Sequence, residues 1–62
     1  MIPVQIIDRN SATFRTNLPT LPRPGDYLEF ASSGGGASRV VVVEVVFYFV
    51  DNVFQFVNVQ VG

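Results

Sequence analysis

The apolar run from Val40 to Val50 constrains the fold more than any other part of this sequence. It consists of valine and aromatic residues with one charged residue, Glu44, and such side chains suit the pleated surface of a β-strand. The run is too short to cross a membrane as a helix, which needs about 20 residues. Alternation makes one face of the strand wholly apolar and leaves Glu44 as the one charged residue on the other. Because a half-exposed antiparallel strand alternates apolar and polar residues, both faces of this strand need cover.

The other apolar segments also favour strands. No segment has apolar residues at helical spacing, and short stretches rich in Val, Ile and Phe are separated by turn residues. The predicted strands are residues 2–8, 12–16, 27–31, 39–50 and 53–61. This pattern predicts one all-β domain over residues 1–62, a five-stranded, mostly antiparallel small barrel or strongly bent sheet.

The connections have the composition of turns and loops. Residues 8–11 are predicted to form a tight turn, and Asp51-Asn52 a two-residue hairpin turn, because Asp and Asn tolerate positive φ. Residues 17–26 hold three prolines and are predicted to form an extended loop that ends in a Pro24-Gly25 turn. Residues 32–38 contain only Ser, Gly and Ala and are interpreted as a flexible connector.

Chain length points to self-association. In a domain of 62 residues, the free energy gained by burying apolar surface nearly cancels the cost of ordering the chain. Such domains usually gain stability from disulfides, a metal or association, and this chain has no cysteine or histidine. We therefore expect a homo-oligomer. A different protein is also a possible partner.

Charge gives no reason to expect a polyanionic partner. The formal net charge is −1, so no global field attracts nucleic acid or anionic lipid. The N-terminus lacks the basic region and apolar core of a signal peptide. The expectation is a protein without membrane association, located in the cytoplasm or in a virion.

Catalysis and cofactors are not expected. The carboxylates have no histidine or cysteine with which to complete a nucleophile–base pair. The Gly34–Gly36 run lacks the lysine and the following helix of a phosphate-binding loop. We predict no enzymatic role, no cofactor and no metal. The carboxylates considered for a site were Asp8, Asp26, Glu29, Glu44 and Asp51.

The segment from Leu18 to Arg23 contains a PxxP core, the type of sequence that binds SH3 domains as a polyproline II helix. Its arginine is displaced by one position from the usual ligand pattern. The favoured interpretation is structural, with Leu18 and Leu21 covering the open end of the domain's own barrel.

Nucleic-acid binding is a second hypothesis. Small β-barrels bind single strands by combining phosphate contacts with aromatic stacking. Phe14 or Tyr27 could provide the stacking surface. The arginines, however, are scattered along the chain and balanced by five acidic residues. The candidate phosphate contacts are Arg9, Arg15, Arg23 and Arg39.

The segment Pro22-Arg23-Pro24-Gly25-Asp26-Tyr27-Leu28, followed by a glycine loop and residues 39–45, resembles small SH3-like or Sm-like barrels. Similar segments occur in short phage and bacterial proteins of unassigned function. The resemblance covers roughly residues 22–60 of this chain. It implies an SH3-like barrel that works by assembly, and it brings no catalytic residues.

The C-terminal hairpin contains a conflict of register. A turn at Asp51-Asn52 pairs Phe49 with Phe54 and Phe47 with Phe56, which forms one aromatic patch. Farther from the turn, the same register places polar residues on the aromatic side. Either a bulge near Phe56-Val57 resets the register, or the hairpin tip leaves the barrel and buries the patch against a neighbour; the second is favoured.

We therefore predict a structural or protein-interaction module that self-assembles through apolar faces of this hairpin. The alternatives are a single-stranded nucleic-acid-binding barrel and an accessory β-module that binds a peptide or small ligand. The predicted interface residues are Val42, Phe47, Phe49, Phe54 and Phe56.

Overall fold

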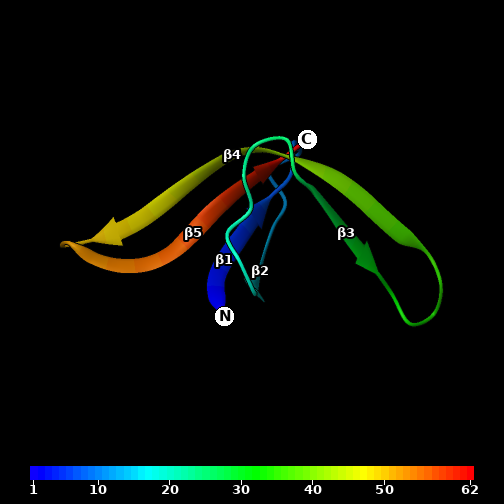
Figure 1. The fold of residues 1–62 in the computed structure, drawn as a ribbon, viewed down its shortest axis with the longest axis horizontal. Coiled ribbons are helices and arrows are strands. Elements are labelled where there is room, and N and C mark those ends of the chain that lie inside the picture. Colours follow the sequence, from blue (N-terminus) through cyan, green and yellow to red (C-terminus); the bar gives the residue numbers. More distant parts are fainter.

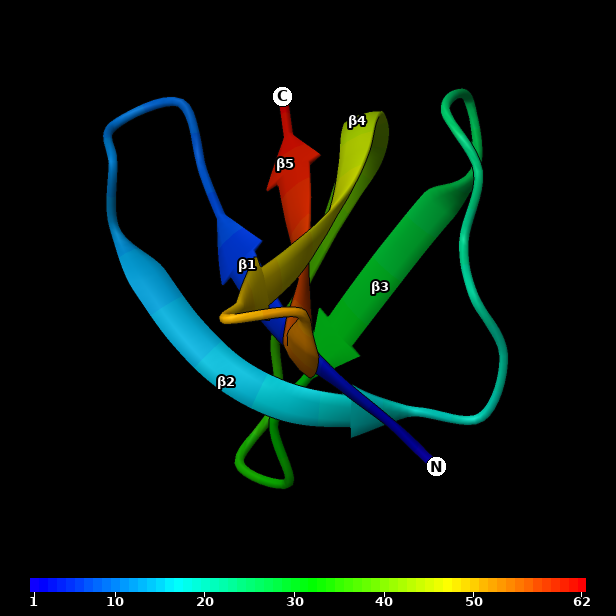
Figure 2. The ribbon, with the colours of Figure 1, turned by 90° about the vertical axis from the view of Figure 1, so that its left-hand side faces the viewer.

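A computed structural model of residues 1–62 contains five β-strands and no helix. The strands form one mixed sheet that curls into a half-barrel (Figures 1 and 2). The strand order is β2-β1-β5-β4-β3, with β1 parallel to β5 and the other pairs antiparallel. The all-β, mostly antiparallel, strongly bent sheet expected from the sequence is therefore confirmed. The chain forms no helix capable of crossing a membrane. The strands are β1 (Ile2–Ile7), β2 (Thr13–Leu18), β3 (Tyr27–Ala31), β4 (Ala37–Val50) and β5 (Val53–Val61).

The ends of three strands differ from the predictions. β1 ends one residue early, at Ile7, and β4 begins two residues early, at Ala37. β2 starts one residue late, at Thr13, and continues through Leu18, which was predicted to lie in the proline loop. Leu18 pairs with Ile2 and packs against the core, so tertiary burial extends the strand beyond its turn-like composition.

The turns use the residues that their backbone geometry requires. Asp51 and Asn52 have φ values of 50° and 65°, which confirms the predicted two-residue hairpin turn. Gly25 has a φ of 96°, and the Asp26 N–H donates to the Arg23 carbonyl at 3.0 Å. Pro24-Gly25 therefore forms the predicted turn.

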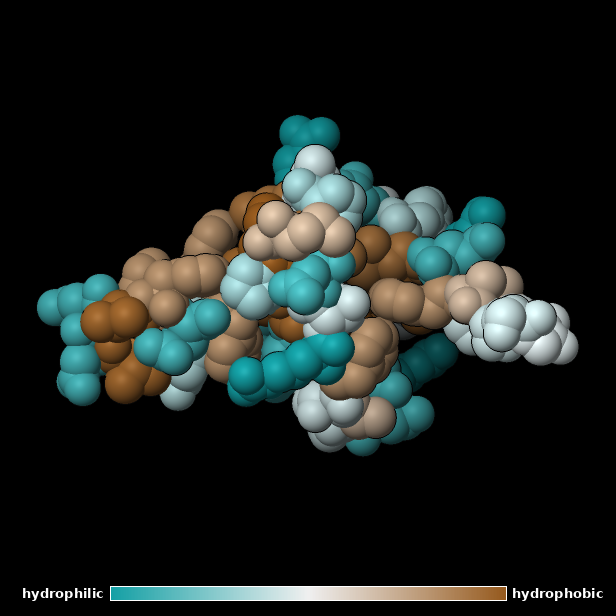
Figure 3. Space-filling model, turned by 90° about the horizontal axis from the view of Figure 1, so that it is seen from below, coloured by the Kyte–Doolittle hydropathy of each residue, from teal (hydrophilic) through white to brown (hydrophobic).

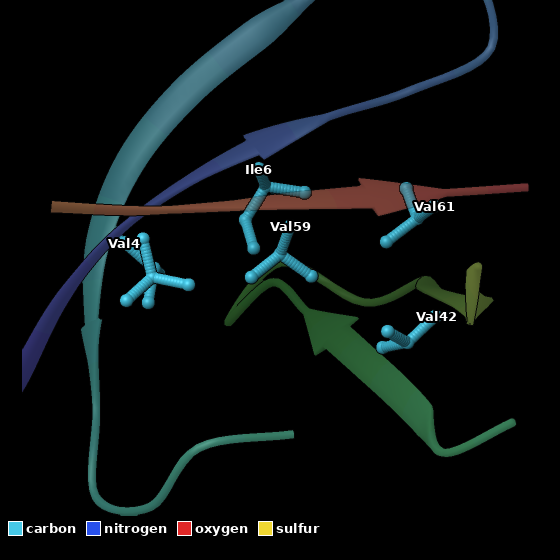
Figure 4. Close-up of a cluster of buried hydrophobic side chains, with 6 residues drawn as sticks. Val4, Ile6, Val42, Val59 and Val61 are labelled. Carbon is cyan, nitrogen blue, oxygen red and sulfur yellow. The ribbon is translucent and has the colours of Figure 1, made fainter. Parts of the chain in front are cut away.

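The core lies on the inner face of the curl, where side chains from β1, β4 and β5 converge (Figure 4). Phe14 of β2 and Phe30 of β3 meet across the open side, with ring centroids 5.3 Å apart, although these two strands do not pair. The half-barrel is thus closed by side chains instead of a backbone ladder. The six buried core residues are Val4, Ile6, Val42, Val57, Val59 and Val61.

The β4–β5 register shifts twice. Val50 pairs with Val53 and Phe49 with Phe54, as predicted, but a β-bulge then leaves Gln55 without a partner. The prediction that Phe47 pairs with Phe56 is wrong, because Phe47 pairs with Val57. A second shift, at Val43, brings Val42 opposite Val61. The bulge alternative is thus realised, one to two residues before its predicted place, and the hairpin also extends away from the body; burial of the patch against a neighbour stays a prediction.

β4 spans the long axis of the molecule, which measures 41 × 21 × 21 Å (Figure 1). The β3–β4 hairpin extends to one end, and the β4–β5 hairpin extends to the other. Residues 48–50 of β4 and 53–56 of β5 form a two-stranded tip beyond the body, and residues 45–47 pair with the part of β5 that also pairs with β1. We define the C-terminal ribbon as residues 45–50 and 53–56. This ribbon contains four of the five residues predicted to form an interface.

Candidate interaction surface on the C-terminal ribbon

The inner face of the ribbon carries three phenylalanines that the chain leaves about half exposed. Phe47 lies on the core side because it pairs directly with buried Val57, and Phe49 shares that side. The ring centroid of Phe54 lies 5.7 Å from that of Phe49 and 6.4 Å from that of Phe47. Phe47, Phe49 and Phe54 are 52%, 54% and 40% exposed. The aromatic cluster therefore continues the apolar face of the core beyond the body.

Phe56 lies on the opposite, outer face, so its predicted place in the aromatic patch is wrong. The bulge at Gln55 shifts the alternation by one residue and pairs Phe56 with Tyr48, with stacked rings 5.0 Å apart. The guanidinium of Arg15 lies 4.3 Å from the Phe56 ring centroid, a cation–π contact. The Arg15 Nε also donates a hydrogen bond to the Gln5 Oε1 at 3.3 Å.

Val42 is part of the core and not of a surface. Its side chain is 1% exposed and packs with Val61 and the valines of β5. The bulge at Val43 allows Val42 to face inward next to a strand segment that leaves the body. The predicted interface residue Val42 is therefore already buried within the single chain.

The predicted interface omitted exposed residues on the outer face of the ribbon. Val46, Tyr48 and Val50 alternate along β4, and Val53 pairs with Val50. The second apolar face of the Val40–Val50 run is the sequence feature that indicates these residues. Figure 3 shows hydrophobic residues over the end of the molecule that the ribbon forms, at the left, with hydrophilic residues at its tip. The exposed large apolar residues of the ribbon are Val46, Phe47, Tyr48, Phe49, Val50, Val53 and Phe54.

These seven side chains are between 40% and 60% exposed. They lie on two opposite faces, and the three phenylalanines of the inner face, at about 200 Å² for a fully exposed aromatic side chain, present about 300 Å² of apolar surface. The largest apolar patch on a typical monomer is about 300–600 Å². Each partner in a stable protein complex contributes about 800 Å². The inner face of the ribbon is therefore comparable with a small apolar patch and supplies part of one side of a standard interface.

The structure does not bring the four arginines together. Arg9 lies in the β1–β2 turn and Arg23 in the proline loop, and neither guanidinium has an ion-pair or hydrogen-bond partner. Arg39 forms a 3.2 Å ion pair with Glu29, its cross-strand neighbour, and lies 5.9 Å from the Tyr27 ring. The four guanidiniums thus form no continuous basic track.

Two of the candidate carboxylates hold turns. Asp8 accepts hydrogen bonds from the Asn10 and Ala12 backbone N–H groups, at 2.8 and 3.0 Å. Asp26 accepts one from the Arg23 N–H, at 2.9 Å. No three of the chain's Asp and Glu residues lie close enough to hold a metal ion together. These contacts give the two aspartates a backbone role.

Three shallow hollows lie elsewhere on the molecule, and two of them adjoin the proline loop and the open side of the half-barrel. One is lined by the proline loop and the start of β3, and there Pro22 is buried whereas Leu21 is 37% exposed. Leu18 packs against the core as predicted, but Leu21 does not. The second hollow lies at the open side of the half-barrel, next to Phe14 and Phe30. It is lined mainly by apolar side chains.

Comparisons with protein-family models, with curated proteins and with solved structures found no match to this chain.

Proposed function

We propose that this protein is a structural or protein-interaction module that self-assembles through the apolar surfaces of its C-terminal ribbon. The observation that carries this proposal is the exposure of Phe47, Phe49 and Phe54 on a ribbon that extends beyond the body. A two-stranded hairpin is marginally stable by itself in water, and three or more strands with a hydrophobic face are needed for independent stability. Contact with another chain would supply the missing cover.

Sedimentation velocity over a hundredfold dilution series that begins at micromolar concentration tests the proposal. The expected result is an oligomer at micromolar concentration that dissociates at the lowest concentrations of the series. A monomer mass at every concentration contradicts self-assembly.

Charge substitutions then locate the surface. Phe49→Asp and Phe54→Asp each place a carboxylate in the aromatic cluster, and we expect at least a tenfold weaker association because the charge would have to be desolvated. Circular dichroism should retain the β-sheet signal, since both residues lie outside the core. The matched control is Tyr27→Asp, a 68% exposed aromatic residue on β3. Equal weakening by the control would place the interface elsewhere.

Binding of single-stranded nucleic acid is the second candidate function, and the contact of Arg15 with Phe56, whose ring stacks on Tyr48, favours it. Cationic and aromatic groups on one face are the elements that single-strand binders combine. An electrophoretic shift of short oligonucleotides that weakens with salt and is lost in Arg15→Gln would support this function. Absence of a shift at low salt would exclude it.

A further inference from the structure

We infer that the copies assemble by strand addition, with the free edge of β4 from Val45 to Val50 pairing antiparallel with the same edge of a second copy. This inference rests on the proposed self-assembly and specifies the surface and the type of contact. A two-fold axis perpendicular to the sheet would relate the two β4 strands and give a central four-stranded sheet in the order β5-β4-β4-β5.

The backbone of β4 has a partner on its outer edge only in its first half. β3 pairs with β4 up to Val41, and Val42 exchanges hydrogen bonds with the backbone of Gly25 and Asp26 at 2.8 Å. From Val43 onward, β4 has backbone partners only on the side of β5. An unpaired strand edge is a template for pairing with another chain.

This edge also lacks the features that protect strand edges. Proteins protect them with prolines, charged side chains, bulges or a covering segment. Between Val45 and Val50 there is no proline, no glycine and no charged residue. The segment is β-branched and aromatic throughout, which is the composition that pairs most readily with a like strand.

The other edge of the ribbon, on β5, is protected by comparison. The bulge at Gln55 interrupts its ladder, and the Gln55 Nε2 donates to the Val53 carbonyl at 3.2 Å. Arg15 lies over the neighbouring Phe56 ring. Bulges and such side chains block the approach of a further strand. The two edges of one ribbon therefore differ, and β4 offers the accessible one.

A second copy of this chain is the occupant that fits this edge. Every copy carries the same edge, and two identical antiparallel strands satisfy each other across a two-fold axis. Pairing would convert the marginal two-stranded ribbon into four strands. It would also align the Phe47, Phe49 and Phe54 clusters of both copies on one face. The backbone edges make this contact, and cross-strand neighbours of the two β4 strands add side-chain packing.

Hydrogen exchange of individual backbone amides tests this arrangement on the unmodified protein. Val50 and Val53 flank a two-residue turn, so they form a hydrogen-bonded pair across the hairpin. Because backbone N–H groups point alternately to the two edges of a strand, those of Phe49 and Phe47 point to the free edge. We expect both amides to exchange at least a hundredfold more slowly above the assembly concentration than below it. The Val50 amide, bonded within the hairpin, is the internal reference and should change much less.

The outcomes separate the inference from the proposed function. An oligomer in which the Phe47 and Phe49 amides exchange as fast as in the dilute monomer overturns strand addition, and the aromatic face alone would then form the contact. A monomer at every concentration overturns both. Slowed exchange at the two edge amides of an oligomer supports both.

A chain with N-methyl-Phe47 in place of Phe47 provides the second test, since a protein of this length is accessible to chemical synthesis. N-methylation removes the outward donor and keeps the aromatic ring, whereas Phe47→Ala removes the ring and keeps the donor. Strand addition predicts at least tenfold weaker association for the N-methyl chain than for the alanine variant, with an unchanged circular dichroism spectrum of the dilute monomer. The reverse order would contradict strand addition.

Discussion

The two halves of β4 both contain several valines but have different surroundings. The first half pairs with β3 and β5, carries the Arg39–Glu29 ion pair on its exposed side and ends at buried Val42. The second half pairs only with β5, and its valine and aromatic side chains are mostly about half exposed. The valines of the two halves thus differ in burial, because only the first half has the rest of the half-barrel around it.

This difference separates folding from association within one strand. In the first half, Val40 and Val42 face the core, while Arg39 lies on the solvated outer face together with Val41. From Val46 to Val50 both faces are apolar and about half exposed, whereas Val45 packs against the core. We therefore expect substitutions in the first half to change the stability of the monomer, and substitutions in the second half to change its association.

The largest expected difference is between two valines of β4. Val42→Ala removes side-chain atoms from the core, where Val42 is 1% exposed, and should lower the free energy of unfolding by about 2 kcal/mol. Val50→Ala, at a position that is 43% exposed, should lower it by less than about 0.5 kcal/mol. Urea unfolding of the dilute monomer measures both. Equal losses would show that the ribbon folds as part of the core.

A smaller effect is expected at the turn that precedes β4. Gly36 has a φ of 90°, which costs a residue with a Cβ about 1–2 kcal/mol, so Gly36→Ala should destabilise the monomer by about 1 kcal/mol. Gly34 lacks a positive φ and has open space around it, so Gly34→Ala is the matched control and should be neutral or slightly stabilising. Thermal melting of the two variants compares them. A neutral Gly36→Ala would mean that this turn adopts other conformations without cost.

The smallest effect is expected for the charged pair on the first half of β4. Arg39 and Glu29 have side chains that are 67% and 52% exposed, and exposed ion pairs contribute little. Arg39→Gln should change the free energy of unfolding by less than about 0.5 kcal/mol, with a smaller change at high salt. Urea unfolding at two salt concentrations measures it. A loss above about 1 kcal/mol would show that this pair is part of a larger stabilising network.

Several elements could be predicted because the determining interactions are local. The bounds of β3 and β5 and the Asp51-Asn52 turn follow from side-chain alternation and from residues that tolerate positive φ. The need to cover both faces of β4 was also visible, because alternation alone assigns those faces. The extension of β2 to Leu18 was not predictable from composition, since it depends on burial against a distant core.

The sequence by itself determined the strands, the turns and the conflict of register in the C-terminal hairpin. Only the tertiary structure decided how that conflict is resolved. The two-residue turn holds Phe49 opposite Phe54, while the parallel neighbour β1 requires Val57 and Val59 to face the core with Val4 and Ile6. Side chains alternate with a period of two, so one extra residue, Gln55, is needed to satisfy both requirements. The parallel pairing of β1 with β5 joins distant parts of the chain, and no local pattern encodes which face that pairing will bury.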